Sequence, residues 1–432
     1  MHNPAMRKIV LASAMGTLIE WYDFYLYGTA AALVFNKLFF PEFDPLSGTI
    51  AAFVTYAIGF FVRPLGGIIF GQLGDKVGRK SMLILTLMLM GICTFLMGLL
   101  PTYKSIGIYA PLLLLLLRCI QGLAIGGEYG GAVLMTAEHG HKGRRGLYLG
   151  WVQASVPIAL IFSTVLFSIF AALPEPQFLS WGWRVPFLIG IVLTGVGLFV
   201  RSQIDETPLF KQMQEAKDMP SNPLGEAVRQ YWRQILLVIG ARIAENASFY
   251  VFTVFVLTYV TTCLGIEKSV ILNGVIIASI AEFFALPFFG ELSDKLGRRP
   301  VYLFGSLFLI LFAIPFFWML DTKVTWIIWT GMALAMGVGH AAMYAPQGAL
   351  FTELFGTRVR YSGLSMGYQL ASPLAGGLAP LICTFLLKYG SGNPFWVASY
   401  LIAIGVITTI SVYLLHETHK VDMTKISPRH NV

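Results

Sequence analysis

The segment Gly71-Gln-Leu-Gly-Asp-Lys-Val-Gly-Arg-Lys80 decides the fold, because the chain contains a close copy of it. The copy, Gly290-Glu-Leu-Ser-Asp-Lys-Leu-Gly-Arg-Arg299, begins 219 positions later, and both segments lie between long apolar runs. A basic turn that occurred once would carry little information. Two copies in register indicate an internal repeat of about 200 residues and predict a chain built from two similar halves.

The composition is typical of a protein with many membrane spans. Of the 432 residues, 56% are hydrophobic and only 12% are charged, and the mean hydropathy is +0.71. Soluble domains carry about 25% charged residues, and several apolar runs here reach the length of about 20 residues that crosses a bilayer. The four cysteines, which lie in apolar runs without metal-ligand or disulfide spacing, are Cys93, Cys119, Cys263 and Cys383. We therefore expect neither a metal nor a cofactor.

Twelve apolar runs predict an all-α membrane protein with twelve transmembrane helices in two six-helix bundles. A polar connection at residues 202–234 separates an N-terminal bundle (1–201) from a C-terminal bundle (235–432). The first run contains two carboxylates, so we expect it to remain as a span and not to be cleaved as a signal peptide. The predicted spans are 9–35, 48–71, 81–100, 108–136, 146–172, 183–201, 235–262, 269–290, 301–320, 325–351, 363–388 and 395–415.

The distribution of basic residues predicts the orientation. Six of the 30 Lys and Arg residues lie in loops on one side of the membrane, three lie inside spans, and the remaining 21 lie on the other side. By the positive-inside rule the richer side is the cytoplasm, and both termini lie on it. Membrane orientation thus accounts for the net charge of +8, and we do not expect nucleic-acid binding.

Ionisable residues inside the spans are the candidate functional groups, because a charge in the bilayer is costly and usually faces a cavity or a partner. In the first span, Glu20 and Asp23 are three residues apart and share a helix face. Packing alone could explain one such carboxylate. Two at similar depth favour a functional role.

The fourth span contains Arg118, Gln121 and Glu128. About 15 Å of helix rise separates Arg118 from Glu128, so these two residues cannot neutralise each other directly. Each needs a partner elsewhere, such as Asp23, a substrate carboxylate or water. Gln121 shares a face with Arg118 and adds a neutral donor and acceptor. The glycines at every fourth position from Gly122 predict close helix packing instead.

The second half has fewer ionisable residues in its spans. Arg242 and Glu245 in the seventh span are three residues apart, so they form either a pair within their own helix or part of a site. His340, near the middle of the tenth span, is either a packing group or a ligand contact that titrates near neutral pH. Glu282 in the eighth span has no charged neighbour in its own helix. Tyr344 and Gln347 supply further polar groups.

Acidic and basic residues flank the spans at the predicted cytoplasmic ends. Glu138 precedes Arg145 by seven residues and Glu353 precedes Arg360 by the same distance, which is a second internal repeat. We expect such groups to form latches that close in one state and open in the other. The alternative is static surface ion pairs, which contribute little stability. The predicted cytoplasmic gate comprises Asp75, Arg79, Glu138, Arg145, Asp294, Arg298, Glu353 and Arg360.

Several blocks of the sequence resemble one family. The repeated basic segment resembles the loop after the second helix of each half in the major facilitator superfamily. Five further blocks narrow the likeness: Glu20-Trp-Tyr-Asp-Phe24, Arg63-Pro-Leu-Gly-Gly67, the block from Arg118 to Glu128, Trp181-Gly-Trp-Arg-Val-Pro-Phe187 and Arg360-Tyr-Ser-Gly363. From about residue 12 to about residue 415, the chain resembles the metabolite:proton symporter family, whose members carry shikimate, 2-oxoglutarate, citrate, proline or betaine.

This resemblance implies the major facilitator fold and a secondary transporter, not an enzyme, in the bacterial inner membrane. It implies symport of a small organic acid into the cell with a proton as the coupling ion, no cofactor, alternating access, and a monomer as the working unit. Shikimate is the first candidate substrate. The alternatives are symport of 2-oxoglutarate, citrate or proline/betaine, a proton-antiport exporter, and a membrane sensor that binds a solute without transporting it.

Within that scheme the candidate residues take roles. Arg118 is expected to hold the substrate carboxylate, because a guanidinium can donate two parallel hydrogen bonds. Asp23 and Glu128, with Glu20 third, are expected to carry the proton. Protonation would then free Arg118 for the substrate, and the empty carrier could not reorient while that acid is charged. The remaining predicted substrate contacts are Gln121, Arg242, Glu245, His340, Tyr344 and Gln347.

Overall fold

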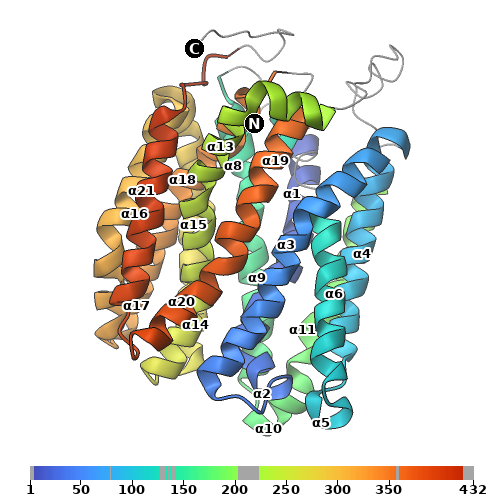
Figure 1. Cartoon of the computed structure of the whole chain (residues 1–432), viewed down its shortest axis with the longest axis vertical. Helices are drawn as coiled ribbons and strands as arrows, with labels where there is room; N and C mark the ends of the chain where they lie inside the picture. The colour runs from blue at the N-terminus through green and yellow to red at the C-terminus, as the bar shows by residue number, and fades with distance from the viewer. Residues whose placement is uncertain are drawn as a thin grey trace.

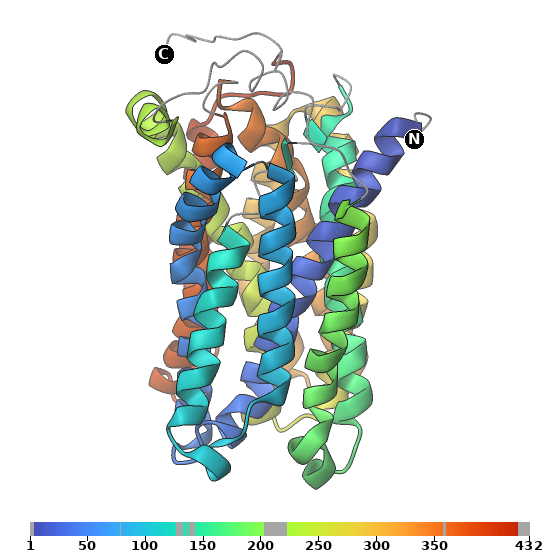
Figure 2. The same ribbon diagram turned by 90° about the vertical axis from the view of Figure 1, so that its right-hand side faces the viewer.

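The computed structural model describes residues 4–77, 79–126, 133–134, 136–137, 143–202, 223–356 and 360–421. All regular secondary structure in these ranges is helical, and the helices join end to end into twelve long rods. The rods run roughly parallel, and the first turn of α1 lies at the same end as the last turn of α21 (Figure 1 and Figure 2). We call that end the terminal face and the other end the opposite face.

Six rods form the N-terminal bundle, and short helices connect some of them. The rods are α1 (Pro4–Ala30) continued by η1 (Ala31–Phe35) and α2 (Asn36–Leu38), α3 (Pro45–Val77), α4 (Arg79–Leu99), α6 (Tyr109–Gly126), α8 (Arg145–Gln153) with α9 (Ser155–Ala171), and α11 (Arg184–Ser202). The connecting pieces are α5 (Tyr103–Ile106), α10 (Glu175–Gln177) and the π-helical turn η2 (Phe178–Gly182).

Six further rods form the C-terminal bundle. They are α13 (Pro223–Tyr250) continued by η3 (Val251–Phe255), α14 (Val256–Thr258) and η4 (Tyr259–Cys263), α15 (Lys268–Leu296), α16 (Arg298–Asp321), α17 (Thr325–Leu334) with η5 (Ala335–His340) and α18 (Ala341–Glu353), α19 (Arg360–Ser372) with η6 (Pro373–Gly377) and α20 (Leu378–Tyr389), and α21 (Phe395–Leu414). The twelve rods match the twelve predicted spans. Helix α13 begins inside the predicted connection 202–234, and its backbone leaves helical geometry at Tyr231 (φ −125°, ψ 24°) before the apolar part begins.

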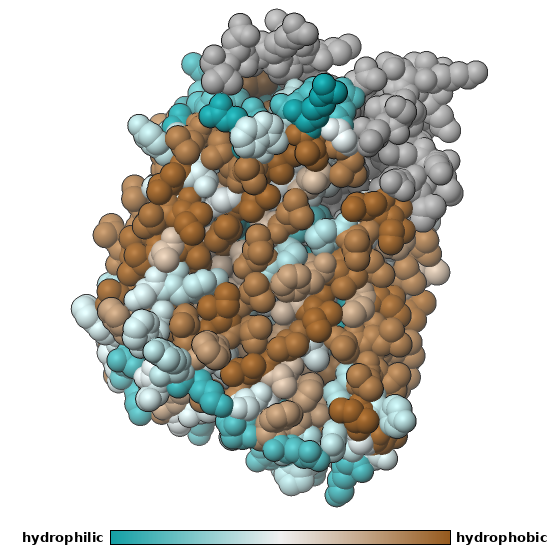
Figure 3. Space-filling model, viewed as in Figure 1, coloured by the Kyte–Doolittle hydropathy of each residue, from teal (hydrophilic) through white to brown (hydrophobic). Residues whose placement is uncertain are grey.

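The surface of the molecule suits a bilayer. Ten of the described helical segments are long and apolar enough to cross a membrane, and α4 adds a shorter apolar stretch, Ile84–Leu99. Hydrophobic side chains cover the broad middle zone in Figure 3, whereas hydrophilic ones gather toward the two ends. Large apolar residues such as Phe284 and Leu311 are 69% and 76% exposed, which is favourable only in contact with lipid.

Glycines allow the closest helix contacts. A Cβ atom on Gly122 would overlap the carbonyl oxygen of Gly59 in α3, and one on Gly126 would overlap that of Arg63. The predicted packing role of these two glycines in α6 is therefore confirmed. Between the bundles, Gly146 of α8 and Gly290 of α15 approach so closely that a Cβ atom on either would overlap the carbonyl oxygen of the other.

The two bundles meet along two seams. Helices α8 and α9 pack against α15 on one side, and α3 packs against α19, η6 and α20 on the other. Four π-helical turns, η1, η3, η5 and η6, interrupt rods whose buried faces meet at the centre of the molecule. Such turns add one residue to a helical turn and occur frequently at functional sites.

Candidate functional site

Buried charged and aromatic residues gather where the two bundles face each other. The N-terminal half contributes groups from α1, α3 and α6, and the C-terminal half contributes groups from α13, α15, η5, α18 and α19. Charged side chains are rarely buried unless another group compensates them. The contacts of each charge therefore indicate what the site is able to bind.

In the N-terminal half, Arg118 is fully buried with only part of its hydrogen-bonding capacity used. Its Nη1 donates to Oε1 of Gln121 at 2.5 Å, and Nε2 of Gln121 donates to Oγ1 of Thr94 at 2.9 Å. Its Nε and Nη2 have no hydrogen-bond partner in the described part of the chain. Two unused donors on one buried guanidinium favour an acceptor that comes from outside, such as a carboxylate.

Aromatic rings surround this guanidinium. Cζ of Arg118 lies 4.0 Å from the ring centroid of Phe24, 4.4 Å from that of Tyr27 and 4.8 Å from that of Tyr56. A Cβ atom on Gly59 would come within 2.6 Å of Nε of Arg118, so this glycine makes room for the side chain. Ring faces stabilise a cation without neutralising it, because they carry no net charge.

Asp23 is a buried acid that also has unused hydrogen-bonding capacity. It is 1% exposed, and neither carboxyl oxygen has a hydrogen-bond partner within 3.5 Å among the described residues. Thr94 and Arg118 are polar groups in its surroundings. Glu20, one helix turn earlier, is also buried at 6% exposure. Glu128, the other acid predicted to carry the proton, lies outside the described residues.

In the C-terminal half, Arg242 is held in a network. Its Nη1 donates to Oε2 of Glu245 at 3.2 Å and to Oε1 of Gln347 at 2.9 Å. Nε2 of Gln347 donates to the same Glu245 oxygen at 2.8 Å and to the hydroxyl of Tyr302 at 3.0 Å. The pair within one helix, which the sequence left as one of two alternatives, is therefore present. The guanidinium also lies over the ring of Tyr368, with Cζ 3.2 Å from its centroid.

His340 lies between two carboxyl groups. Its Nδ1 is 2.5 Å from Oε1 of Glu282 in α15, and its Nε2 is 3.3 Å from Oε1 of Glu245 in α13. The sequence did not identify Glu282 as a partner, because residues 58 positions apart on different helices leave no signal in the spacing. The rings of Phe249 and Tyr344 flank the imidazole, with centroids 5.1 Å and 5.3 Å away.

An aromatic layer connects the two halves. Tyr25 of α1 stacks on Phe249 of α13 at 5.3 Å, and Phe60 of α3 meets Tyr250 edge to face at 5.3 Å. The hydroxyl of Tyr25 and Nδ2 of Asn246 have no hydrogen-bond partner in the described ranges. These groups were missing from the predicted site, although Tyr25 directly follows the block Glu20–Phe24 that the sequence singled out. A small molecule with several hydroxyl groups could satisfy them.

The terminal face contains a second charged cluster. Oδ1 and Oδ2 of Asp294 accept the backbone N–H groups of Gly146 and Leu147, each at 2.9 Å, at the first turn of α8 in the other bundle. Arg298 pairs with Asp294 at 2.7 Å and with Glu353 at 3.4 Å. This cluster joins the bundles at that end.

The remaining gate residues are placed as follows. Arg145 lies 3.7 Å from Glu353, and Arg360 donates from Nε to the carbonyl oxygen of Phe355 at 3.1 Å. Glu138 and the side chains of Asp75 and Arg79 lie outside the part that the structure describes.

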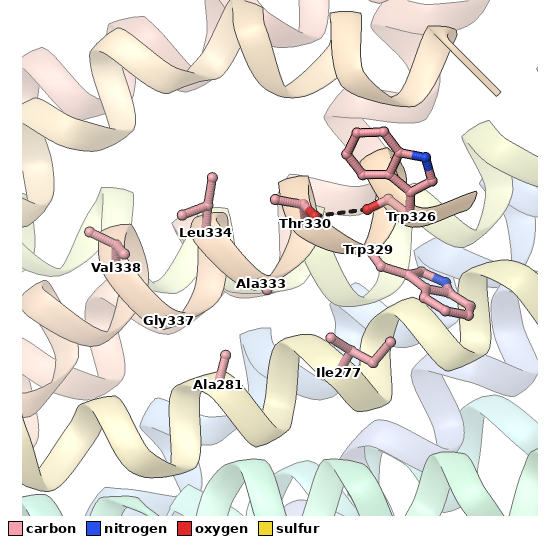
Figure 4. Close-up of a pocket in the computed structure, with 9 residues that line it drawn as sticks. All are labelled: Ile277, Ala281, Trp326, Trp329, Thr330, Ala333, Leu334, Gly337 and Val338. Carbon is pink, nitrogen blue, oxygen red and sulfur yellow. Dashed lines mark hydrogen bonds between the residues drawn. The ribbon is translucent and has the colours of Figure 1, made fainter. Parts of the chain in front are cut away.

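Two surface cavities lie away from these clusters. A groove of about 540 Å³ runs between α15 and the rod of α17 and η5 (Figure 4), and none of its nine lining residues is charged. Its lining is Ile277, Ala281, Trp326, Trp329, Thr330, Ala333, Leu334, Gly337 and Val338. The other cavity, about 500 Å³, includes Glu267 and Lys268 and lies between the end of α9 and the start of α15. Among the described residues, no group of three or more His, Cys, Asp or Glu side chains is arranged so that it could hold a metal ion.

Comparison with known proteins gives a consistent result. The model of the Major Facilitator Superfamily matches residues 13–368 and residues 246–430. The chain is 41% identical to the shikimate transporter of Escherichia coli (strain K12) over 418 residues, which cover 96% of this chain and 95% of that protein. It is 35% identical to the proline/betaine transporter of the same strain, over 96% of this chain and 84% of that protein.

The fold has solved counterparts. The partially occluded inward-open conformation of the xylose transporter XylE from E. coli superposes with a TM-score of 0.74 at 17% identity, over 96% of this chain and 99% of that chain. The proton:xylose symporter XylE bound to 6-bromo-6-deoxy-D-glucose superposes with a TM-score of 0.72 at 17% identity, over 96% of both chains. At this identity the likeness concerns the architecture of two six-helix bundles.

Proposed function

The chain belongs to the Major Facilitator Superfamily, and from that premise we propose that it is a proton-coupled symporter that takes up a small organic acid. It is a multi-pass membrane transporter and not an enzyme, as are the relatives and structural neighbours that it matches. Shikimate is the substrate that we put first, because the shikimate transporter of E. coli shares 41% of its residues with this chain.

The incomplete coordination of Arg118 supports an anionic substrate more than any other observation. Its Nε and Nη2 have no partner in the described part of the chain, while the residue is fully buried. A carboxylate that accepts from both nitrogens would satisfy them in a bidentate arrangement. The free polar atoms of Tyr25 and Asn246 would then contact the hydroxyl groups of the same molecule.

Asp23 is the residue that we propose for the coupling proton. A buried carboxylate without hydrogen bonds is more favourable in its neutral, protonated form. Protonation of Asp23 would leave the charge of Arg118 available to the substrate carboxylate. The loaded carrier is then close to neutral in this half, which favours its reorientation in the bilayer.

Alternating access would follow from rocking of the two bundles around this central site. We propose that the terminal face is cytoplasmic, in a bacterial inner membrane, and that the cluster of Asp294, Arg298 and Glu353 is a latch that closes it. No cofactor is needed in this scheme beyond the proton, and one chain suffices as a working unit.

The direct test is uptake of radiolabelled shikimate into proteoliposomes under an imposed inward proton gradient. We expect accumulation that collapses when a protonophore is added. If 2-oxoglutarate or citrate accumulates and shikimate does not, the mechanism stands and the substrate assignment is wrong. Accumulation of proline or betaine alone would contradict an acidic substrate, and proton-driven export would contradict symport. Binding without any flux would indicate a solute sensor.

A further inference from the structure

A second titratable cluster lies in the C-terminal half, apart from Asp23. His340 contacts a carboxyl oxygen with each of its ring nitrogens, Glu282 at 2.5 Å and Glu245 at 3.3 Å. The three side chains come from η5, α15 and α13, and they are only 1%, 0% and 3% exposed. We propose that Glu282, His340 and Glu245 form a second proton-binding site and that this site holds its proton in the present conformation.

Counting protons supports this proposal. A neutral imidazole has one N–H group and one lone pair, so it can donate to only one of two carboxylates. With both acids ionised and the ring neutral, a nitrogen lone pair would face an anionic oxygen with no hydrogen between them. One additional proton removes this conflict, either as an imidazolium that donates twice or as a carboxylic acid that donates to the ring. Both forms contain the same atoms, so the proton belongs to the cluster as a whole.

Charge balance leads to the same conclusion. Arg242 pairs with Glu245 at 3.2 Å and contributes one positive charge. With the additional proton, the four residues have two positive and two negative charges. Without it, they carry a net charge of −1 in a buried site. An uncompensated buried charge is strongly unfavourable, so the geometry seen here is that of the loaded site.

Every helix packed against His340 contributes to this environment. The turn η5 contacts α13, α15, α16, α17 and α18. Their titratable or charged groups near the imidazole are Glu245 and Arg242 from α13, Glu282 from α15, Tyr302 from α16 and Tyr344 from α18. Helix α17 contains no ionisable residue. Tyr25 of α1 is a neighbour of Glu282 from the other half.

Proton loss would affect packing as well as charge. His340 connects α13 to α15, and Glu245 also accepts from Gln347 of α18. When the proton leaves, one of the two His340 contacts becomes repulsive, so α13 and α15 lose one of their polar links. The occupancy of this site and the packing of the C-terminal bundle are therefore linked. The role in transport rests on the proposed symport, whereas the proton site itself does not.

Thermal unfolding in detergent without substrate tests the site independently of transport. We expect the Tm of the wild type to fall as the pH rises and the site loses its proton. In Glu282→Gln the amide can donate to the imidazole, so no additional proton is needed, and its Tm should fall less over the same range. Glu291→Gln is the matched control, because Glu291 lies on the same helix but is exposed and pairs with Lys295. Its curve should follow the wild type.

Parallel Tm–pH curves for the wild type and Glu282→Gln would overturn the proposal. If Glu282→Gln does not fold, Glu245→Gln is the second variant, because its amide nitrogen can donate to the imidazole and its oxygen can accept from Arg242. The cluster is then neutral without the additional proton and should show the same weaker pH dependence. A variant curve as steep as that of the wild type would again overturn it.

Transport assays then test the coupling role. With shikimate as the probe, we expect Glu282→Gln to lose proton-driven accumulation, to the level seen without a gradient, and to retain exchange of labelled for unlabelled shikimate. Exchange needs only the loaded carrier to reorient, so it does not require proton release. If Glu282→Gln accumulates shikimate to the same ratio of internal to external concentration as the wild type, the coupling role is overturned. A wild type that accumulates none of shikimate, 2-oxoglutarate and citrate but shows the expected Tm–pH difference would contradict the proposed function and leave the proton site supported.

Discussion

The two halves of the molecule bury similar charges in different ways. In the N-terminal half, Arg118 and Asp23 keep unused donors and acceptors among the described residues. In the C-terminal half, Arg242 and His340 lie in a continuous network with Glu245, Glu282 and Gln347. A buried group with free hydrogen-bonding capacity is suited to bind something from outside, whereas a connected network is suited to hold a proton and to fix a conformation.

The largest expected effect tests this contrast between the two arginines. Arg118→Ala should reduce the affinity for shikimate by about 30-fold or more, since removal of a buried charged partner costs about 2–5 kcal/mol. Arg242→Ala should lower the Tm, because it leaves Glu245 buried without its cation, at a cost of about 3–5 kcal/mol. It should reduce the affinity for shikimate less than Arg118→Ala does. Binding of labelled shikimate and thermal unfolding in detergent measure both quantities. Equal losses of affinity for shikimate in the two variants would contradict the assignment of Arg118 to substrate binding and of Arg242 to the structural network.

The next prediction compares the two proposed proton sites. Asp23→Asn should abolish proton-driven accumulation, because the amide cannot bind and release a proton, and should keep the Tm–pH dependence of the C-terminal cluster. Glu282→Gln should change that dependence. The measurements are uptake under a pH gradient and Tm against pH on the same preparations. Unchanged accumulation in Asp23→Asn would exclude Asp23 from coupling.

Much of the fold was predictable from the sequence, because each span is decided locally by about 20 apolar residues. The repeat that begins at Gly71 and Gly290 also gave the two-bundle organisation before any contact was known. The packing of Gly122 and Gly126 followed from their spacing alone, because residues four apart lie on one helix face.

The site was predictable only in part. Burial in a predicted span was enough to single out Asp23, Arg118 and His340. The contact between Glu282 and His340 was not predictable, because it depends on how α15 and η5 pack. From the sequence, Asp294 could pair with a basic side chain or lie at a helix N-terminus, and it does both. That the capped helix is α8 of the other half was not predictable, because this contact also depends on how the helices pack.

A smaller effect is expected at the seam between the halves. Asp294→Asn leaves one acceptor oxygen for the two N–H groups of Gly146 and Leu147 and removes the charge beside the first turn of α8. We expect the free energy that favours the closed terminal face over the open one to fall by about 1–3 kcal/mol, because a hydrogen bond to a charged group contributes about that much. Spin labels at Arg144 and Leu296, in a cysteine-free background, should report a new population with a longer distance.

The matched control for this variant is Glu291→Gln, an exposed change on the same helix whose side chain pairs with Lys295 at 2.8 Å. It should keep the wild-type distance distribution. If Asp294→Asn keeps it too, the cap does not hold the halves together.

The smallest effect concerns a second cap at the same face, which lies within one half. Oε1 and Oε2 of Glu417 accept the backbone N–H groups of Arg298 and Arg299, each at 2.9 Å, at the first turn of α16. Partial burial raises the pKa of Glu417, but these backbone donors outweigh it and hold the pKa below its usual value. The docked carboxylate therefore contributes its full stabilisation above the usual pKa, and this contribution is lost as the pH falls through the lowered value.

A spin label at Lys420 should consequently be immobile at neutral pH and become mobile only in acid, at a pH below the ordinary pKa of a carboxyl group. In Glu417→Gln the label should be more mobile at every pH, with a cost of about 1 kcal/mol for the weakened cap. A label at Lys104 on the opposite face is the control for general acid unfolding and should not change. If the Lys420 label keeps its mobility at low pH in the wild type, this cap does not hold the segment, and the cross-half cap of Asp294 is then the one that matters for closing the terminal face.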